Sequence, residues 1–446
     1  MNSFFKKLGF GAVLLWGAVG VPPAEAKLFD MEEFYLDNGL QVVVIPNYKA
    51  PIVQQMVWYK AGSVDELPGK GGTAHLLEHL MFRGTDKVKD DSFNKIIEEN
   101  GGAFNAFTSR DYTAYHEFVD VSRLELVMFL EADRMRNLKI TPEYFEKERD
   151  IVFQERKQVV ENQPTSYFSE SLTRDLWQEH PYARPVTGTI QEIEGLKLAD
   201  VEGFYKDYYM PNNALLVLSG DVNYATAQEL ARKYYGDIEK RPVGPKADFP
   251  VLDKKSATKV EMKLPQIATK RFVQSFVVPS YVQDRRRAFA LDVLAKYLGG
   301  GETSKLYKKL VLDEEAAVGV SASYDMTARS YGTFTIAALP KENLSNEDFS
   351  RKLAEAVDEA VRELNAEELQ KAKKRMLAGL TYLKDDPRDA ANIVGLLAVS
   401  GMSVEDIENY DVNINNVSLS EIRAAAQELT NAINVQGILV AGKGRQ

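Results

Sequence analysis

Hydrophobic and polar positions follow helical spacing in some segments and strand-like spacing in others, and both spacings occur in each half of the chain. Short apolar or alternating runs predict strands at 40–45, 52–59, 272–278 and 332–338. Two further apolar runs each follow a helical segment, at 213–220 and 435–442. Each of these two runs is expected to be the last strand of a unit, so the sequence predicts an α+β fold built from two similar units.

A change of composition separates the two predicted units. Residues 239–255 contain several prolines and a glycine between polar residues, which is typical of a linker. We therefore expect a domain at 27–240, a linker at 241–255 and a second domain at 256–446. A chain of 446 residues is long enough for two such domains.

The segment 74–82 predicts a short helix that is apolar on most sides. Thr73 is a possible N-cap, and Gly84 stands where the helix would stop. His75 and His79 are four residues apart, so their side chains project from one face of this helix. Glu78 falls on the same arc.

These three residues form the pattern H-x-x-E-H in a chain with only four histidines. Zinc is commonly held by two histidines and a carboxylate with one position left open, and a nearby glutamate then serves as general base. The alternative is a pair of hydrogen-bonded core histidines. We consider it weaker, because three unpartnered polar groups on a buried helix would each cost about 1–3 kcal/mol.

A longer helix is predicted from 142 to 162, with a proline at its start. Glu148 and Glu155 lie within its apolar stripe, which consists of Tyr144, Phe145, Ile151, Val152 and Val159. A glutamate on a buried face needs a partner or a metal ion. The periodicity alone also allows a solvated pair on a charge-rich helix.

Two adjoining strands are predicted at 101–108 and 113–115, with a turn at 109–111. An ordinary hairpin would explain this segment by itself. Together, however, the H-x-x-E-H motif, the Gly-Gly-x-x-Asn-Ala-x-Thr stretch at 101–108 and a distant glutamate resemble the pitrilysin and insulysin family, most closely its mitochondrial processing peptidase branch. The resemblance covers nearly all of 28–442.

The resemblance implies a role for each of seven residues. It places one zinc ion per chain between three ligands, His75, His79 and Glu155. It makes Glu78 the general base and Glu148 the group that orients a ligand histidine. It also places Asn105 and Ala106 on an edge strand that pairs with the substrate backbone. Other divalent ions can occupy such a site, and His116 and His180 are expected to be structural.

The implied fold is two homologous domains, each a mixed, mostly antiparallel β-sheet with helices packed on it, together forming a half-shell. The implied activity is zinc-dependent hydrolysis of peptides or unfolded protein segments. Family enzymes usually also carry an arginine and a tyrosine in the second half, where this chain has Val311 and Val318. We therefore expect a homologous partner subunit to supply that pair, with a homodimer also possible. The alternative is a non-catalytic core or assembly subunit.

The N-terminus predicts export. Lys6 and Lys7 precede an apolar stretch at 8–21, and Ala24-Glu25-Ala26 is typical of a signal-peptide cleavage site. We expect 1–26 to be a signal peptide cleaved after Ala26, giving a periplasmic or secreted protein with no stable membrane span. An uncleaved anchor is the alternative.

Composition excludes several further kinds of chemistry. With no cysteine, the chain has no disulfides, no thiol catalysis and no cysteine-containing zinc site. A net charge of −10 argues against binding nucleic acid or an anionic membrane.

Overall fold

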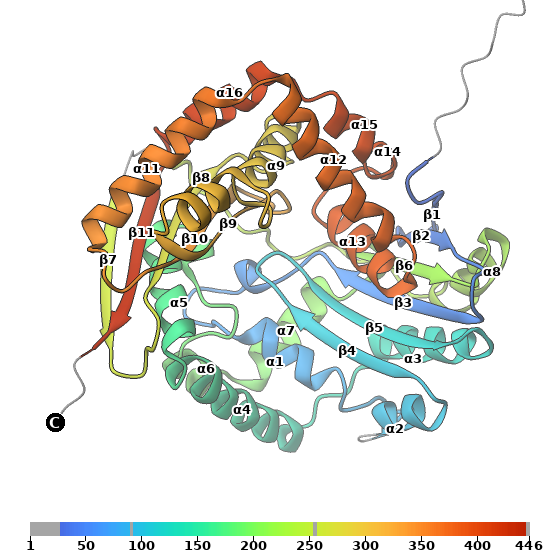
Figure 1. Ribbon diagram of the computed structural model, residues 1–446. Helices are drawn as coiled ribbons and strands as arrows, with labels where there is room; N and C mark the ends of the chain where they lie inside the picture. Colours follow the sequence, from blue (N-terminus) through green and yellow to red (C-terminus); the bar gives the residue numbers. More distant parts are fainter. Residues whose placement is uncertain (1–26, 90–91, 253–256, 443–446) are drawn as a thin grey trace, which may run out of the picture.

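The computed structural model describes residues 27–89, 92–252 and 257–442 and arranges their strands in two sheets (Figure 1). The predicted signal peptide and its cleavage site lie outside the described residues. The strands of the first sheet are β1 (Glu32–Tyr35), β2 (Gln41–Pro46), β3 (Ile52–Tyr59), β4 (Ala103–Thr108), β5 (Thr113–Asp120) and β6 (Ala214–Gly220). Those of the second sheet are β7 (Ala257–Leu264), β8 (Arg271–Val278), β9 (Ala317–Asp325), β10 (Gly332–Pro340) and β11 (Asn434–Ala441).

The two sheets repeat one topology. The first has the strand order β1-β2-β6-β3-β5-β4, and the second has β7-β11-β8-β10-β9. Without β1, each order begins with a parallel pair, β2 with β6 or β7 with β11, and continues through antiparallel pairs. The expected α+β fold with two mixed, mostly antiparallel sheets is therefore confirmed. In each sheet the predicted last strand, β6 or β11, lies beside a strand from the beginning of its unit.

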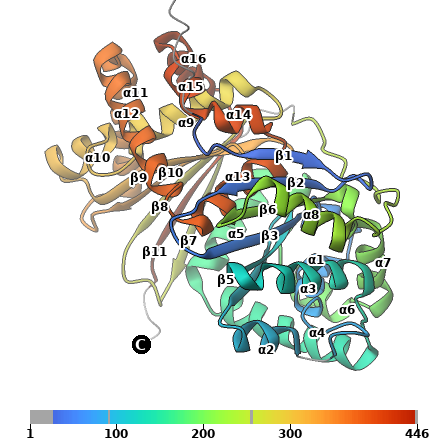
Figure 2. The ribbon, with the colours of Figure 1, turned by 90° about the vertical axis from the view of Figure 1, so that its right-hand side faces the viewer.

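Helices surround both sheets, and Figure 2 shows α11, α12 and α16 at one end of the molecule and α2, α3 and α4 at the other. The helices of the first half are α1 (Thr73–Leu80), α2 (Ser92–Glu99), α3 (Leu124–Asn137), α4 (Pro142–Arg156), α5 (Pro164–Trp177), α6 (Ile190–Gly195), α7 (Leu198–Tyr208) and α8 (Tyr224–Tyr235). Those of the second half are α9 (Arg285–Gly299), α10 (Lys305–Tyr307), α11 (Asn346–Glu363), α12 (Ala366–Leu383), α13 (Pro387–Val399), α14 (Val404–Glu408), α15 (Tyr410–Asn415) and α16 (Leu419–Leu429). Residues 239–252 contain no helix or strand, and the exact domain boundaries stay a prediction.

Strands β2 and β6 are buried on both faces, which explains why they are nearly continuous apolar runs rather than alternating ones. On β3, Val57 and Tyr59 belong to the core beneath α1, α3 and α7, whereas Met56 and Trp58 belong to the core shared with the second half. Successive side chains of a strand point to opposite faces. Each strand of this kind therefore contributes to two cores at once.

Each half contributes one helix that packs on the sheet of the other half. The first-half helix α5 packs on β7, β8 and β11 of the second sheet, and the second-half helix α13 packs on β3 and β6 of the first (Figure 1). Phe168 and Leu172 of α5 close one core, and a Cβ at Gly437 of β11 would lie 2.5 Å from Leu172. Arg329 adds a polar link between the halves, with ion pairs of 2.8 Å to Asp65 and 3.1 Å to Asp111.

Close packing of α13 on the first sheet depends on Gly395. A Cβ at this position would lie 2.2 Å from Nε1 of the buried Trp58. We expect Gly395→Ala to lower the free energy of unfolding by up to about 2 kcal/mol, since overpacking costs about 1–3 kcal/mol and helix propensity returns only about 1. Urea denaturation, monitored by circular dichroism, measures the change in the free energy of unfolding.

Gly379 of α12 provides the matched control, because a Cβ there would meet nothing within 4 Å. Gly379→Ala is expected to raise the free energy of unfolding by about 0.5–1 kcal/mol. Equal effects of the two substitutions would contradict the packing argument.

Among the described residues, none of the helices is both long enough and apolar enough to span a bilayer.

Candidate metal centre

Helix α1 presents His75 and His79 on one face, as the spacing predicts. Their rings lie 4.9 Å apart between centroids at an angle of 76°. The other sides of the helix are buried through Leu76, Leu77 and Leu80. The histidine face is thus the side of α1 that remains accessible.

The start of α1 differs from the prediction. Its N-cap is Gly72, with a φ of 89°, and Thr73 already lies within the helix. The buried carboxylate of Glu66 accepts hydrogen bonds from the backbone N–H groups of Gly72 (3.2 Å) and Ala74 (2.8 Å). A carboxylate from the preceding loop therefore takes the capping role that was expected of Thr73.

Helix α4 brings Glu155 to the two histidines. Thr141 caps this helix by accepting a hydrogen bond from the N–H of Tyr144, and Pro142 begins it. Oε2 of Glu155 lies 3.5 Å from Nε2 of His79 and 4.0 Å from Nε2 of His75.

The donor set and spacing of these residues fit a zinc ion. One ligand atom from each of His75, His79 and Glu155 lies within 4.8 Å of the others. Ligands about 2.0–2.2 Å from one ion lie within roughly 4 Å of each other, so small side-chain rotations would close the set. Two imidazoles and a carboxylate are also a common donor set for this metal.

Glu148 lies behind His79 on the same helix as Glu155. Its carboxylate is buried, with Oε2 3.3 Å from Nδ1 of His79 and the other oxygen paired with Arg83. The contact with Nδ1 leaves Nε2 of His79 directed at Glu155. Glu148 is thus close enough to Nδ1 to fix the orientation of the His79 ring.

Glu78 lies beside the group of three rather than within it. Its Oε2 accepts a hydrogen bond of 2.5 Å from the hydroxyl of Thr108, at the end of β4. Burial raises the pKa of Glu78, although Thr108 and His79 oppose the shift. A carboxylate with a raised pKa is suited to proton transfer near neutral pH.

The two histidines differ in the direction in which their pKa values are shifted. Burial, with a contribution from His79, lowers the pKa of His75 to about 4, against the opposing effect of Glu155. Burial also acts to lower the pKa of His79, but Glu148, Glu155 and Glu78 together outweigh it and raise this pKa to about 9. The contact with His79 in turn lowers the pKa of Glu155.

Strand β4 forms the edge of the first sheet next to α1. It pairs with β5 on one side only, and its contact with α1 places it beside the histidine helix. Asn105 is exposed on this strand, and Ala106 is partly buried. The predicted turn at 109–111 is found where expected. Strand β5 continues beyond the predicted end at 115 to Asp120, so His116 lies within it.

The remaining residues singled out from the sequence lie apart from this group. His180 accepts a hydrogen bond from the N–H of Tyr182 and contacts Ser330. Val311 is partly buried against the core of the second half, and Val318 is 62% exposed on β9. Neither valine carries a hydrogen-bond donor in its side chain.

The predicted apolar stripe of α4 is wrong in part. Phe145 and Val152 are buried, but Ile151 is 40% exposed and Val159 is 49% exposed. Ile151 is four positions before Glu155 and shares its open face. Val159 lies beyond the end of α4, in a π-helical turn at Lys157–Glu161, so the predicted helix at 142–162 is regular only to Arg156. The prediction also missed Thr108 and Arg83, although Thr108 stands in the quoted strand motif and Arg83 follows His79 by one helical turn. Glu66 gave no signal in the sequence.

Comparison with known proteins gives these residues a context. The family model described as "Insulinase (Peptidase family M16)" matches residues 41–190, and "Peptidase M16 inactive domain" matches 195–376. The zinc protease PqqE of Helicobacter pylori is 27% identical over 441 residues, covering 96% of each chain. A probable mitochondrial-processing peptidase subunit beta of Arabidopsis thaliana is 25% identical, covering 88% of this chain and 75% of that protein.

Solved structures agree with this relationship. The crystal structure of a protease from Helicobacter pylori has a TM-score of 0.84 at 26% identity and covers 92% of this chain and 99% of its own. A putative M16-like peptidase from Alicyclobacillus acidocaldarius shares the fold, with a TM-score of 0.82 at 20% identity over 93% of this chain and 99% of its own. On the matched models, relatives and fold, the chain belongs to peptidase family M16, the insulinase family of zinc metallopeptidases.

Proposed function

We propose that this chain is a zinc-dependent endopeptidase that hydrolyses extended peptides or unfolded protein segments. The observation that carries the proposal is the convergence of His75, His79 and Glu155, with Glu78 beside them. Family membership alone does not establish activity, because the second family model matched here describes an inactive domain. The complete group in the first half supports catalysis there.

Each residue of the group has a separate task. His75, His79 and Glu155 would hold one zinc ion, which supplies Lewis acidity and acidifies a water molecule. Oε2 of Glu78 is fixed by Thr108. The Glu78 carboxylate takes the proton of the attacking water and delivers it to the nitrogen of the leaving amine. Glu148 fixes the ring of His79 through Nδ1.

Strand β4 supplies the peptide-binding surface. An extended substrate can pair with the free side of this edge strand near Asn105 and Ala106 through main-chain hydrogen bonds. Such bonds are independent of side-chain identity, and they require the substrate to be unfolded. The proposed substrates are therefore extended or unfolded segments rather than folded proteins.

A second, homologous subunit would complete the site. In the enzyme family, an arginine and a tyrosine reach the substrate carbonyl, whereas Val311 and Val318 stand at those positions here. The name of the Arabidopsis relative describes one subunit of a processing peptidase. We infer that a related subunit with an arginine and a tyrosine provides hydrogen-bond donors to the carbonyl, since a second copy of this chain would bring the same two valines.

The second candidate function is that of a non-catalytic core or assembly subunit. The missing donor pair favours it, while the intact group of His75, His79 and Glu155 opposes it. The sequence at 1–26 also supports export. A basic stretch and an apolar stretch precede Ala24-Glu25-Ala26, so we propose that the protein is periplasmic or secreted.

Metal analysis of the purified protein tests the proposal. We expect one zinc ion per chain, its loss in Glu155→Gln, and about 10–100-fold weaker zinc binding in Glu148→Gln, because carboxylates that orient a ligand histidine tune affinity by that factor. Glu143→Gln, at an exposed glutamate of the same helix, is the matched control and should leave zinc content unchanged. Unchanged zinc binding in Glu155→Gln would refute the ligand assignment.

A further inference from the structure

A polar cavity lies where the turns of two edge hairpins meet. The β4–β5 turn comes from the first half, the β9–β10 turn from the second, and residues 181–186 close a third side. The cavity has a volume of about 190 Å³, and its polar lining includes Arg110, Tyr112, Tyr182, Asp325, Tyr331 and Thr333.

Two walls of this cavity continue directly into the candidate metal centre. The turn that carries Arg110 follows Thr108, whose hydroxyl binds Glu78. On the other wall, residues 181–186 lead to Thr187, whose carbonyl would lie 2.6 Å from a Cβ at Gly72, the N-cap of α1. A peptide that leaves the end of β4 would thus pass the opening of this cavity.

The side chain of Arg110 is charged and has no direct counterion in the part of the chain that the structure describes. Among the described residues, its guanidinium makes no ion pair or hydrogen bond and lies 5.4 Å from the ring centre of Tyr182. Burial lowers its pKa, with Tyr182, Asp111 and Asp325 opposing the shift. A partly buried cation of this kind is stabilised by an incoming anion.

The nearby carboxylates already have other partners. Asp111 accepts hydrogen bonds from the hydroxyl of Tyr182 (2.6 Å) and from Arg329 (3.1 and 3.2 Å). Asp325 accepts them from the backbone N–H (2.9 Å) and hydroxyl (2.7 Å) of Thr327.

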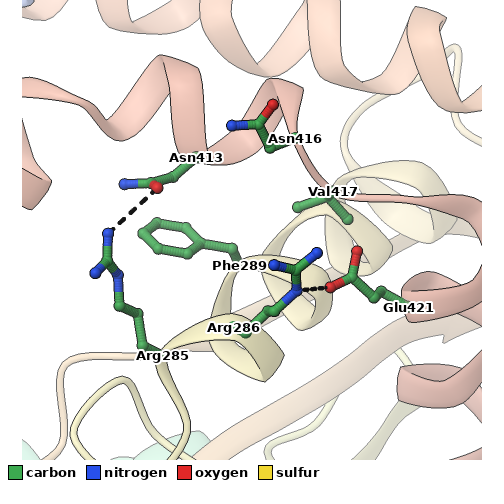
Figure 3. A pocket seen from close by; sticks show the side chains of 7 residues that line it. All are labelled: Arg285, Arg286, Phe289, Asn413, Asn416, Val417 and Glu421. Carbon is green, nitrogen blue, oxygen red and sulfur yellow. Dashed lines mark hydrogen bonds and ion pairs between the residues drawn. The ribbon is translucent and has the colours of Figure 1, made fainter.

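Another cavity shows the opposite arrangement. There, Arg285 contacts Asn413, and Arg286 pairs with Glu421 (Figure 3). Arg285 also forms an ion pair with Asp406. Both arginines have protein partners, so they do not require an incoming anion as Arg110 does.

The backbone of the turn around Arg110 is held in place. The carbonyls of Ser109 and Arg110 accept hydrogen bonds from the N–H groups of Ser63 (3.1 Å) and Val64 (3.0 Å). Gly62 packs so closely that a Cβ there would lie 2.4 Å from both carbonyl oxygens. A fixed turn reduces the ordering cost when Arg110 binds a ligand.

We propose that Arg110 binds a carboxylate of the peptide substrate in this cavity, close to the cleaved bond. The inference rests on the proposed function and adds a substrate preference to it. A guanidinium pairs with a carboxylate through two parallel hydrogen bonds, which gives both affinity and orientation. The carboxylate is either an acidic side chain or the free C-terminus of the substrate.

Matched peptides test the proposal with the active enzyme or complex. One series places Glu or Gln at each position around the cleaved bond, and a second compares free-acid with amidated C-termini. We expect the wild type to prefer one carboxylate peptide over its neutral match by about 10–100-fold in kcat/KM, as for charge-assisted hydrogen bonds. Arg110→Gln should abolish that preference by lowering kcat/KM of the carboxylate peptide to that of its neutral match.

Three further variants separate recognition from structure. Arg110→Lys should keep part of the preference, because it retains the charge without the planar fork. Asp325→Asn should increase the preference, because it removes a competing negative charge from the cavity wall. Arg123→Gln removes a charge from an exposed arginine and should change nothing.

The outcome can be separated from that of the proposed function. Fluorescence anisotropy can measure binding of the same peptides to the Glu78→Gln variant. This measurement reports the preference for a carboxylate even if no cleavage occurs. Equal binding of acidic and neutral peptides at every position and terminus would overturn the proposal. An equal loss for both kinds of peptide in Arg110→Gln would also overturn it, since it would show a structural role only.

Discussion

Replacing Glu78 by glutamine is expected to lower peptide hydrolysis by about 10²–10⁴-fold while zinc binding stays intact. The amide has nearly the shape of the carboxylate, but it cannot accept the proton of the attacking water. Because Glu78 lies outside the group formed by His75, His79 and Glu155, its loss should not empty the metal site. Cleavage of a fluorogenic extended peptide, with zinc content measured on the same sample, gives both readouts.

Glu143→Gln serves as the control here as well, since it makes the same chemical change at an exposed site. A Glu78→Gln protein that cleaves at the wild-type rate would show that Glu78 is not the general base. Loss of zinc together with activity would instead show that Glu78 maintains the metal site.

Adding a homologous subunit that carries the arginine and tyrosine is expected to raise activity by about 10²–10³-fold over the isolated chain. This is the usual effect of a hydrogen-bond donor to the developing oxyanion, and Val311 and Val318 provide none. The measurement compares kcat/KM of the isolated chain with that of the chain mixed with each candidate partner. Full activity of the isolated chain would contradict the need for a partner.

A variant of this chain offers a complementary test. Val318 is 62% exposed, so Val318→Tyr should be tolerated in the fold. Combined with Val311→Arg, it should recover part of the activity if the two positions face the substrate in the assembled enzyme. The single change Leu312→Tyr, at a residue that is 59% exposed nearby, is the matched control and should recover none.

Local spacing made the histidine helix predictable. His75, Glu78 and His79 are close in sequence, so the geometry of one helix turn determines their relation. Glu155 could not be assigned by spacing, because its approach to His79 depends on how α4 packs against α1. Only the resemblance to a family supplied that assignment. The repeated fold was predictable for a similar reason, since apolar runs mark strands regardless of distant contacts.

Features that depend on how separate segments pack could not be predicted from the sequence. Glu66 caps α1 from the preceding loop, six and eight residues before the N–H groups that it binds, so the adjacent Thr73 was the natural but incorrect choice. Ile151 and Val159 fit the apolar period of the predicted helix at 142–162, yet both are exposed, and Val159 lies in the π-helical turn that follows α4. The unpaired state of Arg110 depends on side chains from three segments that no local pattern connects.

The packing of α13 on the first sheet has a consequence for folding during synthesis of the chain. Met56 and Trp58 of β3, together with Leu215 and Val217 of β6, form an apolar surface against which α13 packs. This helix ends at Val399, so the surface stays uncovered until most of the second half has been synthesised. Exposed apolar surface of this kind is prone to aggregate and is a target for chaperones. For a chain with a predicted export signal, the same delay would keep the first half from completing its fold before translocation.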